Sequence, residues 1–390
     1  MNRRSPHPFA PARQQGLSLI ELMIALVVGL VFMAGVISMF LASRQSYTLG
    51  SAVARLQENG RFALDFMRPV LRLAGYTGCG GQSMWQAPSV NLLNVQTDVY
   101  NFTQAIQGYD YNSPATNVGG SYAITSETPA LDTSASDWSP ALPATIWSAI
   151  SNTVIPGSDI IMIHAVTPGG IAISNFPGGG NSANVQVYNT SSLANAGLVI
   201  GTIAYVTNCS QSAVFQATNV NQSSGTVEHA VAGGIVTPGN VSAGKVSNFS
   251  LPAQLYTIQT YLYYIGRGAD QGPALFVIKL TNTATLGTPQ ELVPDIENMQ
   301  ILYGVDTDGD GIANQYVAAS GIANWAAANI VSVRLGLLIR SNNNVVPAMT
   351  PTALDVDGVA VTPPPNPGAT TTRRLHRVFV ETIAVRNHVP

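Results

Sequence analysis

An apolar run close to the N-terminus constrains this chain more than any other feature. Residues 17–42 read LSLIELMIALVVGLVFMAGVISMFLA and contain one charged side chain, Glu21. As an α-helix rising about 1.5 Å per residue, the run spans roughly 39 Å, enough to cross a bilayer with some tilt. The sequence therefore predicts a transmembrane helix over residues 17–42.

The stretch before this run, MNRRSPHPFAPARQQG, is basic and rich in proline. By the positive-inside rule such a stretch stays in the cytoplasm, so the C-terminal body is expected on the other side of the inner membrane, in the periplasm. A secretory signal peptide has a shorter apolar region that is followed by a small-residue cleavage site. Here a glycine, Gly16, comes before the apolar run instead.

The junction at Gly16 resembles the class III leader of type IV prepilins. Gly16 is followed by an apolar residue, Leu17, and Glu21 is the fifth residue after the glycine. The resemblance implies that prepilin peptidase removes a leader, residues 1–16, and that the new α-amine is methylated. Leu17 stands where the family usually has phenylalanine, which concerns how well the peptidase and the methylating activity accept the site.

Glu21 is costly in this environment, since a carboxylate at the centre of a membrane helix costs about 2.5–3.5 kcal/mol on insertion scales. Such a residue usually marks a function. In the family that the leader resembles, this glutamate pairs with the new α-amino group of a neighbouring subunit. The alternative is a plain signal anchor that tolerates a glutamate near the membrane interface.

After Ala42 the helical pattern continues but becomes amphipathic. The predicted apolar stripe follows steps of three and four residues and comprises Leu49, Val53, Leu56, Gly60, Ala63, Met67 and Val70. We expect one helix from Leu17 to about Leu73 whose second half packs on the chain's own sheet, with a kink or the start of the helix end at Pro69 and a stop at Gly75. The helical segment is thus residues 17–75.

The remainder, residues 76–390, is predicted to be a β-rich body, so the fold class is α+β, with a long N-terminal helix packed on a C-terminal globular domain. The expected strands are residues 159–166, 198–206, 213–218, 255–266, 274–280, 331–340 and 377–386, with a hairpin between 255–266 and 274–280. The strand at 331–340 alternates and should be half buried. Residues 341–372 contain PPPNP and are expected to be a flexible or partner-facing loop.

Charged residues make up only 9% of the chain, and the two cysteines, Cys79 and Cys209, form no CxxC pair. This composition is typical of an extracellular β-rich protein, and in an exported domain the pair is expected to form a disulfide. The chain has no Lys or Arg between Arg72 and Lys245, so it lacks a basic stripe for nucleic acid. No GxSxG, HExxH, GxxxxGK[ST] or GxGxxG motif occurs, and we expect no enzyme activity.

The segment DTDGDGI is the sharpest internal motif. Its carboxylates at alternate positions, followed by glycine, match the start of a calcium-binding loop. The candidate ligands are Asp306, Asp308, Asp310, the carbonyl of Ile312, and Asn314.

This motif departs from an EF-hand loop because Val317 occupies the twelfth position in place of a bidentate glutamate. Asp295 and Glu297 are candidates for the missing ligand by sequence proximity. The alternative is a tight turn, because DGDG suits positive φ and would join residues 299–305 to the segment around Tyr316.

Beyond the leader, the chain resembles the PilW family of minor pilins. The stretches that carry the resemblance are ARLQENGRFALDFMRPVLRLAGYTGC (54–79), TNCSQSAVFQAT (207–218), LVPDIENMQILYGVDTDGDG (292–311) and RRLHRVFVETIAVRN (373–387). The resemblance implies a low-abundance subunit that joins other minor pilins in a priming complex at the inner membrane. It further implies that the subunit stays at the pilus tip, contacts the major pilin and presents a PilY-type tip adhesin, in a system for cell adhesion and twitching motility.

The runner-up is a large pseudopilin that caps a type II secretion filament, since such proteins share the leader and the helix. A membrane-anchored periplasmic enzyme or binding protein is a third class. That class leaves the spacing of Gly16 and Glu21 unexplained.

Overall fold

The computed structural model describes residue 16, residues 18–79, residue 88, and residues 90–177, 184–230, 237–241, 246, 249–281 and 285–385. Its contacts divide the chain into two compact units, Met1–Ser51 and Ala52–Pro390. Residues 1–15 of the predicted leader lie outside the described residues, as does Leu17, the predicted first residue of the mature chain.

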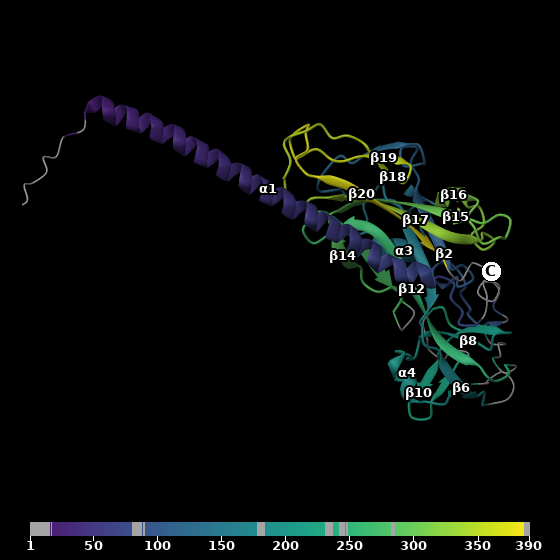
Figure 1. The fold of residues 1–390 in the computed structure, drawn as a ribbon. Coiled ribbons are helices and arrows are strands. Elements are labelled where there is room, and N and C mark those ends of the chain that lie inside the picture. The colour runs from purple at the N-terminus through teal and green to yellow at the C-terminus, as the bar shows by residue number, and fades with distance from the viewer. Residues whose placement is uncertain are drawn as a thin grey trace, which may run out of the picture. The chain divides into compact units, whose positions relative to one another are not determined.

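The helices are α1 (Leu19–Leu73), α3 (Ala144–Ile150) and α4 (Ser191–Asn195), and the 3-10 turns are η1 (Asp98–Tyr100), η2 (Ala135–Asp137) and η4 (Ala319–Gly321). The strands are β1 (Val90–Asn91), β2 (Ile106–Tyr111), β3 (Ser121–Ala123), β4 (Trp138–Ser139), β5 (Ile160–Val166), β6 (Ile171–Asn175), β7 (Val185–Val187), β8 (Ile203–Thr207), β9 (Ser212–Gln216), β10 (Asn219–Asn221), β11 (Thr226–Glu228), β12 (Gln254–Arg267), β13 (Pro273–Lys279), β14 (Gln290–Pro294), β15 (Ile296–Val305), β16 (Gln315–Val317), β17 (Ile330–Arg340), β18 (Leu354–Val356), β19 (Val359–Thr362) and β20 (His376–Ala384). A long N-terminal helix is thus followed by a β-rich body, which confirms the predicted α+β class (Figure 1).

The predicted helix is confirmed, with two corrections. It continues through Pro69 for one more turn and ends after Leu73, where Gly75 takes a φ of 67°. The predicted stripe is right at its centre and shifted at its ends, since Leu49 is exposed while Ala52, Leu64 and Leu71 are buried. The buried residues of the helix are Ala52, Leu56, Gly60, Ala63, Leu64, Met67 and Leu71.

The largest sheet of the second unit is organised around β12. The first part of this strand pairs with β8 and β6, and the later part pairs with β5 and β13, in each case antiparallel. The predicted hairpin between residues 255–266 and 274–280 is therefore confirmed as β12 and β13. The strand predicted at 198–206 is wrong in its first half, because residues 198–202 form a turn with Gly201 at a φ of 95° and β8 begins only at Ile203.

A second sheet has the order β16-β15-β17-β20, and a small sheet has the order β18-β19-β3. β17 was expected to be half buried, but all of its residues except Arg334 are buried. Val333, Leu335 and Leu337 face the main core, while Leu338 packs with Val356, Val359 and Val361 of the small sheet. The second face of β17 is therefore covered, which the alternation of its sequence does not reveal.

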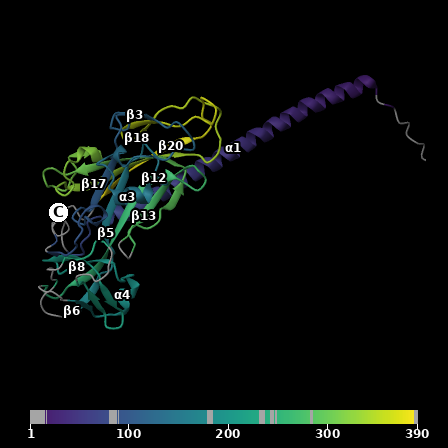
Figure 2. The same cartoon turned by 180° about the vertical axis from the view of Figure 1, so that it is seen from behind.

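The same small sheet corrects the prediction for residues 341–372. These residues contain β18 and β19, and β19 pairs in parallel with β3, more than 200 residues earlier in the chain. Figures 1 and 2 show β18 beside β20 from both sides. The segment is a covering layer of the body and not a plain loop.

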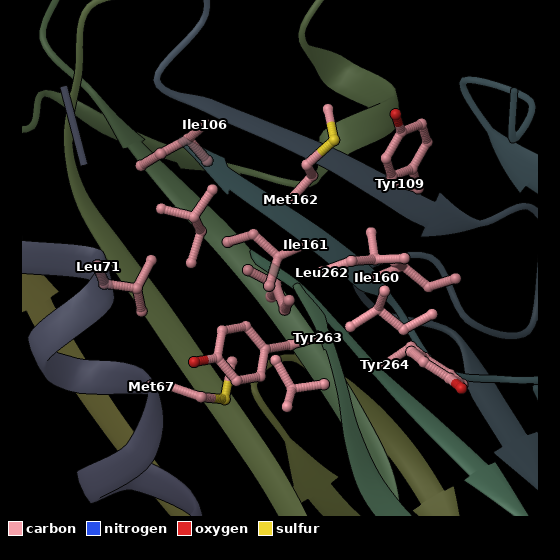
Figure 3. Close-up of a cluster of buried hydrophobic side chains, with 14 of the residues drawn as sticks. Met67, Leu71, Ile106, Tyr109, Ile160, Ile161, Met162, Leu262, Tyr263 and Tyr264 are labelled. Carbon is pink, nitrogen blue, oxygen red and sulfur yellow. The ribbon is translucent and has the colours of Figure 1, made fainter. Parts of the chain in front are cut away.

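The main core joins the second half of α1 to the sheets. Met67 and Leu71 are fully buried and point toward the strands that carry Ile161 and Tyr263, as Figure 3 shows. A second buried cluster lies among β6, β7, β8, β9, β11 and the start of β12, and it includes Phe215 and Leu255. The described part of the body thus has a main core beneath the helix, a second core in the lobe that carries α4, and the smaller cluster between β17 and the small sheet.

Candidate functional site

The predicted processing and assembly residues lie at the start of α1. Gly16 is exposed, with no atom within 4 Å of the position a Cβ would take, and Leu17 is outside the described residues. Glu21 is exposed in the first turn of α1. An acidic side chain there is favoured by the helix dipole, since the first amide N–H groups have no partner within the helix.

The helix that follows Glu21 is apolar on every side. Large side chains from Leu19 to Leu41 are exposed, among them Phe32 (72%) and Met39 (77%). α1 is long and apolar enough to cross a membrane, and no part of its most apolar window is buried inside the structure. An exposed surface of this kind needs lipid or the apolar helices of other subunits around it.

Within the second unit, α1 is fixed to the body by packing and by charge. Arg68 and Glu381 of β20 form a bidentate salt bridge. Arg68 donates from Nε to Oε1 of Glu381 at 2.6 Å and from Nη2 to Oε2 at 2.8 Å. The hydroxyl of Tyr263 donates to the carbonyl of Phe66 at 3.3 Å. Sequence reasoning missed the Arg68–Glu381 pair, because 313 residues separate its members.

The structure contains the predicted disulfide between Cys79 and Cys209, with Cα atoms 5.1 Å apart and a sequence separation of 130. Cys79 follows the end of α1 closely, and Cys209 lies in the turn between β8 and β9. The bond therefore ties the end of the helix to the lobe that carries α4.

The predicted calcium loop connects β15 to β16. Asp306, Asp308 and Asp310 each have a carboxylate oxygen within 4.8 Å of the others. Asp306 is buried and accepts backbone N–H groups from Asp308 (3.1 Å), Gly309 (2.6 Å) and Gly311 (2.8 Å), and it accepts the amide of Asn329 at 3.0 Å. Desolvation works to raise the pKa of Asp306, but these backbone donors outweigh it and lower the pKa.

The other candidate ligands of this loop are partly engaged. Asn314 accepts from the backbone N–H of Thr307 at 2.6 Å and donates to Asp308 at 3.2 Å, and Ile312 donates its N–H to Asp310 at 2.8 Å. The turn interpretation accounts for all of these contacts, and β15 and β16 do pair as a hairpin. The calcium interpretation stays a prediction.

Asp295 and Glu297 are not available as further ligands of this loop. They lie at the opposite end of β15, a strand of ten residues and therefore about 30 Å long. Asp295 accepts from Nε of Arg340 at 3.0 Å, and Glu297 lies 3.6 Å from Nη1 of Arg340 and 3.3 Å from Nε2 of His376. The two carboxylates belong to a buried ionic cluster that the sequence did not reveal.

A second buried group that the sequence did not reveal is a pair of aspartates. Asp110 and Asp159 are hydrogen-bonded to each other, and burial raises the pKa of both. Asp159 also accepts from the backbone N–H of Tyr111 at 3.1 Å and of Ile301 at 2.8 Å, while Ser320 donates to Asp110 at 2.5 Å. The pair holds β2, β5 and β15 together beneath η4.

Two family models match the chain. The N-terminal match is to the prokaryotic N-terminal methylation motif, over residues 11–37. The C-terminal match is to Type IV Pilus-assembly protein W, PilW, over residues 262–387. No curated protein matches.

Among solved structures, the chain is similar to the type IV-like pilin TTHA1219 from Thermus thermophilus, with 16% identity, a TM-score of 0.20, and coverage of 52% of this chain and 94% of that chain.

The methylation motif, the exposed apolar helix and the β-rich body together define a type IV pilin-like protein. Its C-terminal region, from the middle of β12 to the end of β20, carries the PilW domain. The resemblance of the sequence to the PilW minor pilins is thereby confirmed.

Proposed function

We propose that this protein is a minor pilin that helps to start assembly of a type IV pilus and remains in a complex at the pilus tip. Before assembly it would sit in the inner membrane with its body in the periplasm. Its partners there would be other minor pilins, the major pilin and a PilY-type tip adhesin. The observation that carries the proposal is an exposed apolar helix with Glu21 in its first turn, in a chain with a PilW domain.

The physical basis is the exchange of lipid for neighbouring helices. The apolar side chains from Leu19 to Leu41 can move from the bilayer into a filament core without exposure to water. Glu21 cannot do so alone, because an unpaired charge in an apolar core is expensive. The α-amino group that cleavage after Gly16 would create on an adjacent subunit is a matching positive charge.

The body would act as a structural module in this role. Its ionic cluster around Arg340 and its buried aspartate pair connect secondary-structure elements. The helix is fixed to the body by Arg68 and Glu381. A force on the filament would therefore pass from α1 directly into β20.

The test separates membrane insertion from assembly. Glu21→Ala should insert in the inner membrane as well as the wild type does, or better, and should be depleted from sheared pili. Quantitative immunoblotting of both fractions, normalised to the major pilin, measures this. Glu58→Ala is the matched control, an exposed acidic residue on the same helix. Equal incorporation of Glu21→Ala into pili would contradict the assembly role.

The second candidate is a pseudopilin that caps a type II secretion filament, because the leader and the helix serve both systems. A strain that lacks this gene separates the two. Loss of surface pili, twitching and adhesion with normal secretion supports the pilus. Loss of secretion with normal pili supports the pseudopilin.

A further inference from the structure

A pocket of about 330 Å³ opens in the lobe that carries α4. The turn between β5 and β6, the start of β12, and the segment from the end of β7 into α4 line it. Figures 1 and 2 show α4 and β6 in the same lobe from both sides. Ligand pockets in proteins have volumes of roughly 300–1,000 Å³, so this pocket has room for a small molecule or one end of a larger one.

One wall of the pocket is a close approach between the backbone of the β5–β6 turn and side chains of β12. Gly169 has a φ of +96°, and a Cβ on the next residue, Gly170, would lie 2.5 Å from Cζ of Tyr256 and 2.7 Å from Oε1 of Gln254. Glycine at both positions lets the β5–β6 turn take a positive φ and lie directly against these side chains of β12. A side chain at Gly170 would displace the turn or the side chains of Tyr256 and Gln254 and so change this wall of the pocket.

The lining of the pocket also contains an aromatic ring and side-chain amide groups. Tyr188 is 73% exposed. Asn189 uses its side-chain oxygen to accept from Ser191 Oγ at 2.7 Å and from the backbone N–H of Ser191 at 3.2 Å, so its side-chain amide nitrogen is the group left to donate to a ligand. The side chain of Asn195 makes no hydrogen bond within the part of the chain that the structure describes.

No residue of the lining is charged, which limits the class of ligand. A phosphate, sulfate or carboxylate would find no Lys, Arg or His, and a metal ion would find no carboxylate. A wholly apolar ligand would leave the amides of Asn189 and Asn195 without partners when it excluded water. The lining fits a neutral molecule that has an apolar face and several hydroxyl groups.

We infer that this pocket binds a neutral hexopyranose, as the end of a surface glycan. The ring of Tyr188 stacks on the C–H face of the sugar, and Asn189 and Asn195 hydrogen-bond to its hydroxyl groups. The pocket lies outside the residues matched by the PilW model, and none of its lining residues is on α1. The inference therefore does not depend on the proposed role in assembly.

The experiment uses the full-length protein in detergent and tests binding by saturation-transfer NMR and calorimetry. The probes are the methyl glycosides of glucose, galactose and mannose and their neutral disaccharides. N-acetylneuraminic acid and glucose 6-phosphate are the anionic comparison. At least one neutral probe should bind, and Tyr188→Ala should weaken that binding about tenfold or more.

The control at the same position is Tyr188→Phe, which keeps the ring and should bind within about twofold of the wild type. Asn195→Ala should weaken binding, whereas Asn342→Ala, an exposed asparagine elsewhere on the body, should not. The inference is overturned if no neutral probe binds, if only the anionic probes bind, or if Tyr188→Ala binds as the wild type does. Tyr188 is exposed, so its variants should melt at the wild-type temperature and incorporate normally into filaments.

Discussion

Gly60 of α1 lies directly against the ring of Phe379 on β20. A Cβ at position 60 would be 2.8 Å from Cε1, Cε2 and Cζ of that ring. Together with the Arg68–Glu381 ion pair, this contact fixes the position along β20 at which α1 crosses the strand. The glycine has a packing role, although glycine lowers helix stability by about 1 kcal/mol relative to alanine.

The first prediction concerns this contact. Gly60→Ala should destabilise the body by about 1–2 kcal/mol, since overpacking outweighs the gain in helix propensity. In a Phe379→Leu background the same change should be neutral or stabilising. Chemical unfolding of the four proteins gives the coupling energy, and Gly50→Ala, which meets no neighbouring atom within 4 Å, is the control. Equal effects in both backgrounds would show that the ring does not restrict position 60.

The second prediction concerns processing. The mature chain should begin at Leu17, with a methylated α-amine, because Gly16 and Glu21 have the prepilin spacing and the methylation motif matches residues 11–37. N-terminal mass spectrometry of protein from sheared pili measures this. A mature protein that starts at Met1, or at any residue other than Leu17, would contradict it. Gly16→Val should block cleavage.

The third prediction concerns the disulfide. Replacing Cys79 and Cys209 together by serine should lower the free energy of unfolding by roughly 2–4 kcal/mol. The disulfide joins residues with a sequence separation of 130, so its loss returns conformational freedom to a long loop of the unfolded chain. Denaturant unfolding of the wild type and the variant gives the difference. Trapping with an alkylating reagent tests the bond itself, and two free thiols in periplasmic material would refute it.

The fourth prediction concerns calcium. If the loop binds the ion, millimolar calcium should raise the melting temperature. The free energy of unfolding should rise by about 2.7 kcal/mol when the free calcium concentration is 100 times the dissociation constant. Asp308→Asn is the cleanest variant, because the side chain of Asp306 accepts several backbone N–H groups and would disturb the turn if changed. The shift should vanish in Asp308→Asn. No shift in the wild type would leave the turn as the whole explanation.

The fifth prediction concerns pH. Burial raises the pKa of Asp110 and Asp159 in the folded state, so between pH of about 4 and their folded pKa the unfolded chain binds fewer protons than the folded one. Stability from this pair is therefore greatest at acidic pH and is lost as pH rises. Asp110→Asn supplies a permanent N–H donor to Asp159 and should gain stability relative to the wild type from pH 4 to pH 7. The measurement is the free energy of unfolding of the wild type and Asp110→Asn as a function of pH. A constant difference between the two proteins from pH 4 to pH 7 would contradict this prediction.

Some strands were predictable because a local pattern decides them. β12 and β13 were predicted from two apolar runs and a glycine-containing turn, and the turn that joins β15 to β16 was the alternative interpretation of DGDG. The covering of β17 was not predictable in the same way. It depends on β18 and β19, which pair with β3 across a long sequence separation and are too short to stand out as strands.

The sequence by itself determined the N-terminal half of the site. The spacing of Gly16 and Glu21 and the length of the apolar run are local properties that hydropathy and helix geometry translate directly into structure. Only the tertiary structure decided which distant groups meet: Arg68 with Glu381, Asp110 with Asp159, and Asp295 and Glu297 with Arg340 instead of with the calcium loop. The reason is that the residues around a polar or charged side chain do not show which distant residue will be its partner. Strand pairing and burial in the folded chain decide that.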